Sequence, residues 1–264
     1  MRNILLILVI LLFSNGSLSS PIKTIKLAYS DIESFPFQMG NGTSVARPPG
    51  LSIDVIEQAA SQLHIKIEYV RLPGKRVLHH IRANDVDGGF IFSYNQERAK
   101  YADYPLKENQ ADSALRIATL DYFLYKLKQQ PVNWDGTRLE AVNQMLVGAH
   151  RGFSIVKILQ ANKIATLEVE TTEKLFEMLR KRRLAAVAIQ SNIATSFIEE
   201  NQLTNIERIE PPISTKDYYL IFSHRFTQQN PELVEQIWQT IGEVRDQVIE
   251  SNTKKYLAQE KAVN

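Results

Sequence analysis

Residues 90–105 read FIFSYNQERAKYADYP, an apolar run that breaks abruptly into hydrogen-bonding side chains. The apolar part is typical of a buried strand. A strand that ended in an ordinary surface turn would not need so many polar groups, which run here from Ser93 to Arg98. The pattern predicts that something polar sits at the end of this strand.

The N-terminal half of the chain alternates short apolar runs with helical periodicity. The runs predict strands at 25–29, 65–70 and 86–92, and the periodic stretches predict helices at 53–63 and 77–81. Strand, helix, strand, helix, strand is the order of a parallel sheet with covering helices. Arg98 then lies a few residues beyond the carboxyl end of the third strand.

The same alternation begins again after a strand-rich stretch at 115–127. It predicts strands at 145–149, 167–169, 185–189 and 218–223, and helices at 154–161, 175–179 and 231–248. The last helix opens with Asn230, Pro231 and Glu232, which read as N-cap, first-turn proline and first-turn acid. Two α/β units in tandem predict two lobes and a cleft, and ligands of open α/β sheets bind beyond the carboxyl ends of the strands.

The first residues of the chain indicate export. Arg2 precedes an apolar stretch at 4–13, which is too short for a bilayer, since a spanning helix needs about 20 apolar residues. Small polar residues follow it, as in a secretory signal. We therefore predict a cleaved signal peptide at 1–19 and a periplasmic mature protein.

The composition excludes several kinds of site. The chain has no cysteine, which rules out disulfides, thiolate nucleophiles, cysteine-bound zinc and a lipid-modified cysteine. The formal charge of 31 − 29 = +2 argues against a nucleic-acid partner. The one basic run, at 180–183, ends an amphipathic segment, where cations complement the helix dipole. No spacing in the sequence predicts a metal or cofactor site.

Four segments in this order and spacing carry a family resemblance: GLSIDVIEQAASQL at 50–63, the stretch from KRVLHH to KYADYP at 75–105, MLVGAHRGFS at 145–154 and LFEMLRKRRLAAVAIQSNIA at 175–194. The chain resembles the type II periplasmic solute-binding proteins, family 3, the amino-acid-binding components of ABC transporters. The resemblance covers roughly residues 23–257.

This resemblance implies a two-lobed periplasmic-binding-protein fold with a hinge and an interlobe cleft. Residues 20–112 and 211–264 would form lobe 1, and residues 113–210 would form lobe 2. It also implies a monomer that binds a small-molecule ligand, without enzymatic activity, and delivers it to an inner-membrane ABC permease. A protein that reports its ligand to a membrane sensor is the alternative, since both tasks use the same closed form.

In the resembling family, an arginine after the third strand pairs with the ligand carboxylate, and Arg98 stands at that place, with Ser93 and Tyr94 beside it. A guanidinium presents two donors in a fixed fork that matches a carboxylate. The alternative is a surface ion pair of Arg98 with Glu97 or Asp103. The opposite wall is predicted at Gly152, Phe153 and Ser154, where the free amides of a helix N-terminus favour an anion.

Two positions depart from the family pattern. The family usually carries aspartate in the turn before the last strand of the second lobe, where this chain has Ala185. Amino-acid binders carry an acidic residue for the ligand's ammonium group where this chain has Gln190, and a neutral amide cannot supply the charge. Asp31 or Glu33 could replace it, or both are solvated loop carboxylates. Phe35 is the candidate for stacking on the ligand, and Arg76 is either a second cation of the site or a solvated helix residue.

An enzyme of the same fold is the hypothesis from another class. Some proteins with this fold resemble dehydratases, in which carboxylates and a histidine near the cleft would do acid–base work. His79 and His80 are adjacent and would point about 100° apart on a helix, so they do not share one ligand. Only His150 lies at a predicted cleft turn, and a lone histidine there is more often a hydrogen-bonding residue than a base.

Overall fold

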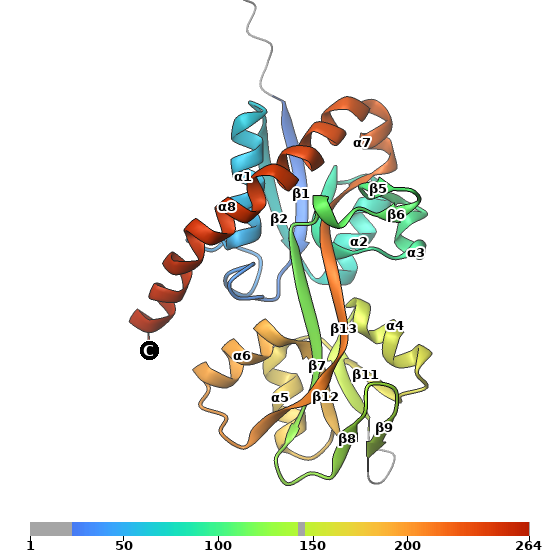
Figure 1. Ribbon diagram of the computed structural model, residues 1–264, viewed down its shortest axis with the longest axis vertical. Coiled ribbons are helices and arrows are strands. Elements are labelled where there is room, and N and C mark those ends of the chain that lie inside the picture. The colour runs from blue at the N-terminus through green and yellow to red at the C-terminus, as the bar shows by residue number, and fades with distance from the viewer. Residues whose placement is uncertain (1–22, 142–145, 264) are drawn as a thin grey trace, which may run out of the picture.

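The structure is a computed structural model that describes residues 23–141 and 146–263. The predicted signal peptide at 1–19 and the predicted strand start at Met145 lie outside the described residues. Figure 1 shows two lobes joined by two long strands, which confirms the predicted two-lobed α/β fold.

The first lobe is built on three strands, of which β1 pairs in parallel with both β2 and β3. Its main elements are β1 Thr24–Ser30, α1 Leu51–Gln62, β2 Lys66–Leu72, α2 Gly74–Ala83 and β3 Gly88–Ser93. Short elements follow: α3 Gln96–Ala99, β4 Ala102–Asp103, β5 Leu106–Lys107, β6 Gln110–Ala111 and the 3-10 turn Ser113–Leu115. The C-terminal helices α7 His224–Gln229 and α8 Pro231–Val263 return to this lobe.

The second lobe repeats the arrangement, with β10 parallel to both β11 and β12. Its elements are the hairpin strands β8 Val132–Trp134 and β9 Leu139–Ala141, then β10 Val147–His150, α4 Ser154–Ala161, β11 Thr166–Val169, α5 Thr172–Arg180, β12 Ala186–Gln190 and α6 Ser191–Glu200. All five residues of β12 are buried, as expected for a strand between covered faces. Gln190 is the polar exception, at the end of that strand.

Two antiparallel strands, β7 Ala118–Leu127 and β13 Ile206–Ser223, run from one lobe to the other (Figure 1). They make one sheet of both lobes, in the order β11-β10-β12-β7-β13-β3-β1-β2. Their pairing shifts register between Ile209 and Ser214. Pro211 and Pro212 lie in this interval, and a proline has no N–H to donate to a ladder.

The predicted elements differ from the observed ones mainly in this crossing region. The strand predicted at 218–223 is the end of β13, which begins at Ile206. Helix α6 and the hairpins were not predicted. The lobe boundaries at 112 and 210 stay a prediction, because β7 and β13 each extend through both lobes. None of the helices in the described ranges is both long and apolar enough to cross a bilayer.

Helix α8 is fastened to the start of α1 by a buried tyrosine. The Tyr256 hydroxyl donates to Asp54 Oδ2 at 2.7 Å and accepts from the Gly50 amide at 3.0 Å. Asn252 Nδ2 donates to the same carboxylate oxygen at 3.0 Å. Gly50 has a φ of +117°, and a Cβ there would lie 2.5 Å from the Phe37 carbonyl oxygen, so the backbone requires glycine.

We expect Tyr256→Phe to lower the free energy of unfolding by about 1–3 kcal/mol, because it leaves the buried Gly50 amide without its acceptor and removes one of the two donors to the half-buried Asp54 carboxylate. Urea unfolding followed by circular dichroism measures the loss. The matched control is Tyr29→Phe, since the buried Tyr29 hydroxyl has no hydrogen-bond partner among the described residues. The control should be as stable as the wild type; equal losses in both variants would contradict this account.

Candidate functional site

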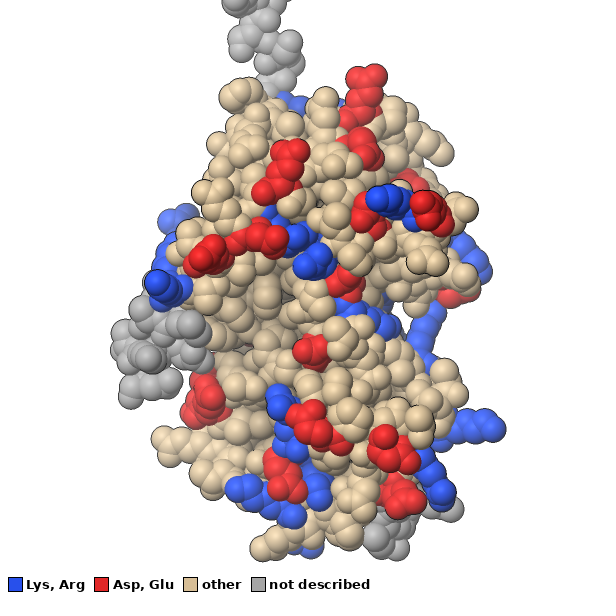
Figure 2. All heavy atoms as spheres, in the orientation of Figure 1, with Lys and Arg blue, Asp and Glu red and all other residues tan. Residues whose placement is uncertain are grey.

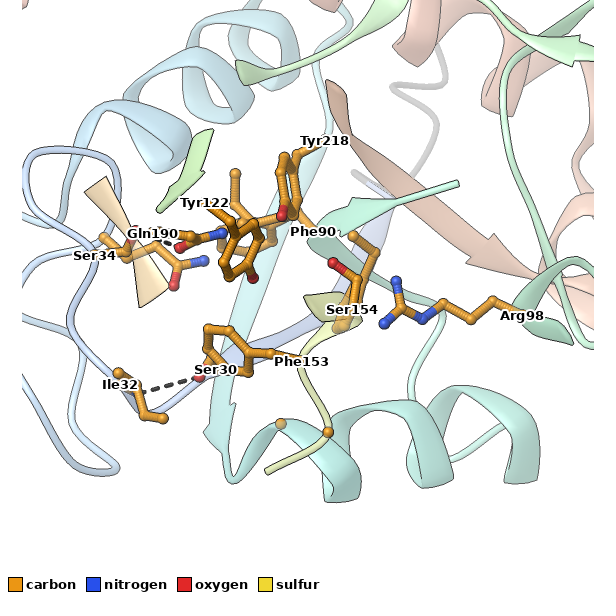
Figure 3. Close-up of a pocket in the computed structure, with 15 residues that line it drawn as sticks. Ser30, Ile32, Ser34, Phe90, Arg98, Tyr122, Phe153, Ser154, Gln190 and Tyr218 are labelled. Carbon is orange, nitrogen blue, oxygen red and sulfur yellow. Dashed lines mark hydrogen bonds between the residues drawn. The ribbon is translucent and has the colours of Figure 1, made fainter. Parts of the chain in front are cut away.

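A pocket lies between the two lobes, at the carboxyl ends of the strands (Figure 3). Its empty volume is about 510 Å³, part of which is open to solvent. Both lobes and both crossing strands contribute to it. The lining residues are Ser30, Ile32, Ser34, Gln38, Gly74, Phe90, Ile91, Phe92 and Arg98 from the first lobe, Gly152, Phe153, Ser154 and Gln190 from the second, and Tyr122 and Tyr218 from β7 and β13.

Arg98 is held in the pocket by the turn after β3. The Asn95 side chain caps the short helix α3 by accepting from the amides of Glu97 and Arg98. The Arg98 side chain is only 8% exposed, and its Nη1 donates to the Ser93 carbonyl at 3.0 Å. Its guanidinium carbon lies 5.5 Å from the centre of the Phe92 ring. In Figure 3 the guanidinium points toward Ser154 of the opposite lobe.

The carboxylates next to Arg98 in sequence are engaged elsewhere. Glu97 pairs with Lys100 at 2.9 Å, and Asp103 pairs with His224 at 3.0 Å. Within the described part of the chain, Arg98 makes no ion pair. The alternative of a surface ion pair is therefore not realised, and the guanidinium keeps donors for a partner from outside the chain.

The wall opposite Arg98 is the start of helix α4, but one of its predicted donors is occupied. The Gly152 amide donates to Glu168 Oε2 at 3.0 Å, and Glu168 also pairs with Lys75 of the first lobe at 3.2 Å. The prediction of a free Gly152 amide is therefore wrong. Ser154 differs, because its buried Oγ lies beside the Tyr122 hydroxyl in the lining of the pocket. The first amides of a helix also have no partner within it.

Gln190 belongs to a polar bridge between the lobes. Ser34 Oγ donates to Gln190 Oε1 at 3.4 Å and accepts from Asn192 Nδ2 at 2.8 Å. Asn192 Nδ2 also donates to the Phe35 carbonyl at 2.9 Å. The lobes thus touch directly beside the pocket, and the oxygen of Gln190 already has a donor.

Ser93 and Tyr94, both predicted ligand contacts, do not line the pocket. The Ser93 carbonyl accepts from Arg98 and, at 3.0 Å, from the Tyr104 hydroxyl. The Tyr94 ring packs edge-on against Tyr104, with 5.3 Å between ring centres. Both residues therefore support the turn that carries Arg98.

Asp31, Phe35 and Arg76 are also absent from the lining. Arg76 is exposed, and Phe35 lines a different hollow between the loop after β1 and helices α5 and α6. Asp31 and Glu33 alternate with the lining residues of that loop. Both of their charges act on Arg71, a buried arginine whose pKa burial lowers and these carboxylates raise.

Arg71 organises the loop after β1, and the sequence analysis missed it. Its guanidinium donates to the carbonyls of Ser30 at 3.3 Å, Met39 at 3.1 Å and Ser44 at 3.0 Å. In the sequence, Arg71 is marked only as a charged residue directly after the strand predicted at 65–70. By fixing this loop, Arg71 places Gln38 in the pocket.

Lys216 is a second cation near Arg98 that the sequence analysis missed. It lies on β13 two residues before Tyr218, so both side chains point to the same face of the strand. Burial lowers the pKa of Lys216, and the nearby Arg98 charge lowers it further. In the described ranges Lys216 has no ion-pair partner either.

The model of the bacterial extracellular solute-binding proteins, family 3, matches residues 27–259. The chain belongs to this family. The predicted resemblance is therefore confirmed. A comparison with curated protein sequences gives no match.

Solved structures similar to this solute-binding protein share its fold at low sequence identity. The GluR0 ligand-binding core from Nostoc punctiforme in complex with L-glutamate is 18% identical, with a TM-score of 0.69 over 88% of this chain and 98% of that one. A histidine kinase sensor domain is 15% identical, with a TM-score of 0.68 over 91% and 95%. The substrate-binding protein of an amino acid ABC transporter is 14% identical, with a TM-score of 0.66 over 86% and 98%.

His150 of this solute-binding protein is a structural residue behind the pocket. It is buried, does not line the pocket, and its Nε2 lies 3.1 Å from Thr172 Oγ1. Burial lowers its pKa to about 3. In the described part of the chain, no cluster of three or more histidine and carboxylate side chains is placed to hold a metal ion.

We expect His150 to make the solute-binding protein less stable in acid. In the unfolded chain the histidine takes up a proton below about pH 6.5, whereas the folded protein resists this down to about pH 3. The stabilisation is complete about one pH unit above 6.5 and is lost as the pH falls. Between pH 7.5 and 5 the loss is about 2 kcal/mol.

Urea unfolding of the wild type and of His150→Gln at both pH values measures this contribution, which should be missing in the variant. The control is His79→Gln at an exposed helix position, which should keep the wild-type pH dependence. Parallel curves for the wild type and His150→Gln would contradict this account, because His150 would then take up its proton as readily in the folded protein as in the unfolded chain.

Proposed function

We propose that this protein is a periplasmic receptor that binds a small carboxylated solute, an amino acid or a related organic acid, in the interlobe pocket and delivers it to an inner-membrane ABC permease. The observation that carries the proposal is Arg98, a buried guanidinium in the lining of the pocket that forms no ion pair with any described residue. Its paired donors match a carboxylate in geometry and charge.

The arrangement of the walls supports binding coupled to lobe closure. Arg98 belongs to the first lobe, and Ser154, toward which it points, belongs to the second (Figure 3). A carboxylate held by both would bridge the lobes and favour the closed arrangement over an open one. The break in pairing between Ile209 and Ser214 gives the crossing strands a place to bend.

A sensor that reports ligand occupancy to a membrane protein is the second candidate. It is supported by the likeness to the histidine kinase sensor domain, as transport is supported by the likeness to the transporter's binding protein. Uptake of labelled ligand by cells that lack the protein separates the two. A receptor for transport is needed for uptake, whereas a sensor changes only the downstream response.

The proposed ligand class can be tested by thermal unfolding of the purified protein with amino acids, amine-free carboxylates, polyamines and sugars. A ligand at about a hundred times its dissociation constant adds roughly 2.7 kcal/mol of stability. Only carboxylated compounds should raise the unfolding temperature. A shift with sugars or polyamines alone would contradict the proposal.

We expect Arg98→Lys to weaken binding of the responding carboxylate by about 10- to 100-fold, because the charge remains while the fork of donors is lost. Titration calorimetry measures the loss, and circular dichroism checks the fold, since Arg98 also binds the Ser93 carbonyl. The control is Arg76→Lys at the exposed start of α2, which should bind like the wild type. Unchanged affinity of Arg98→Lys would remove Arg98 from the site.

A further inference from the structure

The described lining of the pocket carries positive charge only. Its lining contains the cation Arg98 and, among the described residues, no aspartate or glutamate. Lys216 adds a second positive charge close to Arg98, on the same strand face as the lining residue Tyr218. An ammonium group that entered this pocket would be repelled by both cations, and burial strengthens such repulsion because water no longer screens it.

The nearby carboxylates are engaged outside the pocket. Glu168 binds the Gly152 amide and Lys75, and Asp31 acts on Arg71. On the crossing strands, Asp121 accepts from Thr215 and Asp217 accepts from Thr119. Glu33, Glu173 and Glu200 line the hollow that contains Phe35. That hollow and the pocket have no lining residue in common.

The polar side chains of the lining include several donors and are all neutral apart from Arg98. Gln38 Nε2 is buried and has no hydrogen-bond partner in the described chain, whereas the buried hydroxyls of Ser154 and Tyr218 interact with the Tyr122 hydroxyl. The amide nitrogen can only donate, and each hydroxyl can donate one proton or accept one. The Gln190 Oε1 oxygen already receives the Ser34 proton. A ligand rich in oxygen can accept from these donors, whereas a charged ammonium finds only neutral acceptors in the described lining.

From these observations we infer that the pocket selects acids that lack an ammonium group, with an apolar or oxygen-bearing body between the aromatic walls of Phe90, Phe92, Tyr122 and Phe153. The inference rests on the proposed function, in which Arg98 holds the carboxylate. Selectivity comes from the absence of a carboxylate in the described lining. Burying a ligand ammonium without a counter-charge costs far more free energy than burying a C–H bond in its place.

Matched pairs of compounds test the inference on the wild-type protein. Each pair consists of an amino acid and the same acid without its amine: L-phenylalanine and hydrocinnamate, L-leucine and isocaproate, and L-glutamate and glutarate. Titration calorimetry or competition gives both affinities. We expect the amine-free member of the responding pair to bind at least about tenfold tighter, a difference of about 1.4 kcal/mol.

The outcomes separate the inference from the proposed function. If the amino acid of a pair binds tighter and Arg98→Lys weakens it, the inference is overturned and the proposed function stands. If no member of any pair binds, or if binding survives Arg98→Lys at full affinity, both fail. Tighter, Arg98-dependent binding of the amine-free acid supports both.

Gln190→Glu gives a second test, because it adds one carboxylate to the lining with almost no change in shape. It should weaken the amine-free acid and strengthen the amino acid, so that the ratio of their affinities moves by at least about tenfold toward the amine. The control is Gln236→Glu, the same charge change at an exposed position of α8. An unchanged ratio in Gln190→Glu, with the fold intact by circular dichroism, would overturn the inference.

Discussion

The pocket depends on one constraint, a buried guanidinium that forms no ion pair within residues 23–141 and 146–263. Arg98 loses much of its hydration, and the Ser93 carbonyl and the face of the Phe92 ring replace only part of it. The turn from Asn95 to Arg98 has few other ways to fold, because the Asn95 side chain already caps it. The remaining donors of Arg98 are satisfied best by an anion from outside the chain, so the local fold favours binding of an anionic ligand.

The direct contacts between the lobes are weak compared with charge-assisted hydrogen bonds to a carboxylate. The ion pair of Lys75 with Glu168 joins side chains that are 58% and 30% exposed, and such pairs contribute about 0–1 kcal/mol. The bridge of Ser34 with Gln190 and Asn192 consists of neutral hydrogen bonds, one of them 3.4 Å long. In the proposed function, a carboxylate between Arg98 and the start of α4 would add charge-assisted bonds on both sides. The ligand, rather than these contacts between the lobes, would then set the balance between open and closed forms.

Hydrophobic periodicity predicted most of the fold, because burial on one or both faces leaves a period of two or 3.6 in the sequence. The same logic placed Arg98 and Ser154, which follow buried strands. Tyr122 and Tyr218 could not be found this way, since they lie inside β7 and β13, whose long pairing comes from partners distant in sequence. Asp31 was misplaced for a simpler reason. Alternate residues of the loop after β1 face Arg71 and the pocket. The sequence does not show which of the two alternating sets lines the pocket.

The specificity of the pocket is separable from the forces that fold it. The sheet and its helices are held by apolar burial in clusters that run through both lobes, and Gln190 adds no charge to them. A carboxylate at this one position would supply the missing partner for an ammonium without altering the strand, whose backbone pairs with Tyr122 across β7. The neutral amide is bonded to Ser34 instead, so it helps to join the lobes and adds no negative charge opposite Arg98 and Lys216. A single side chain at the end of a buried strand can thus decide the charge class of the ligand while the fold around it stays the same.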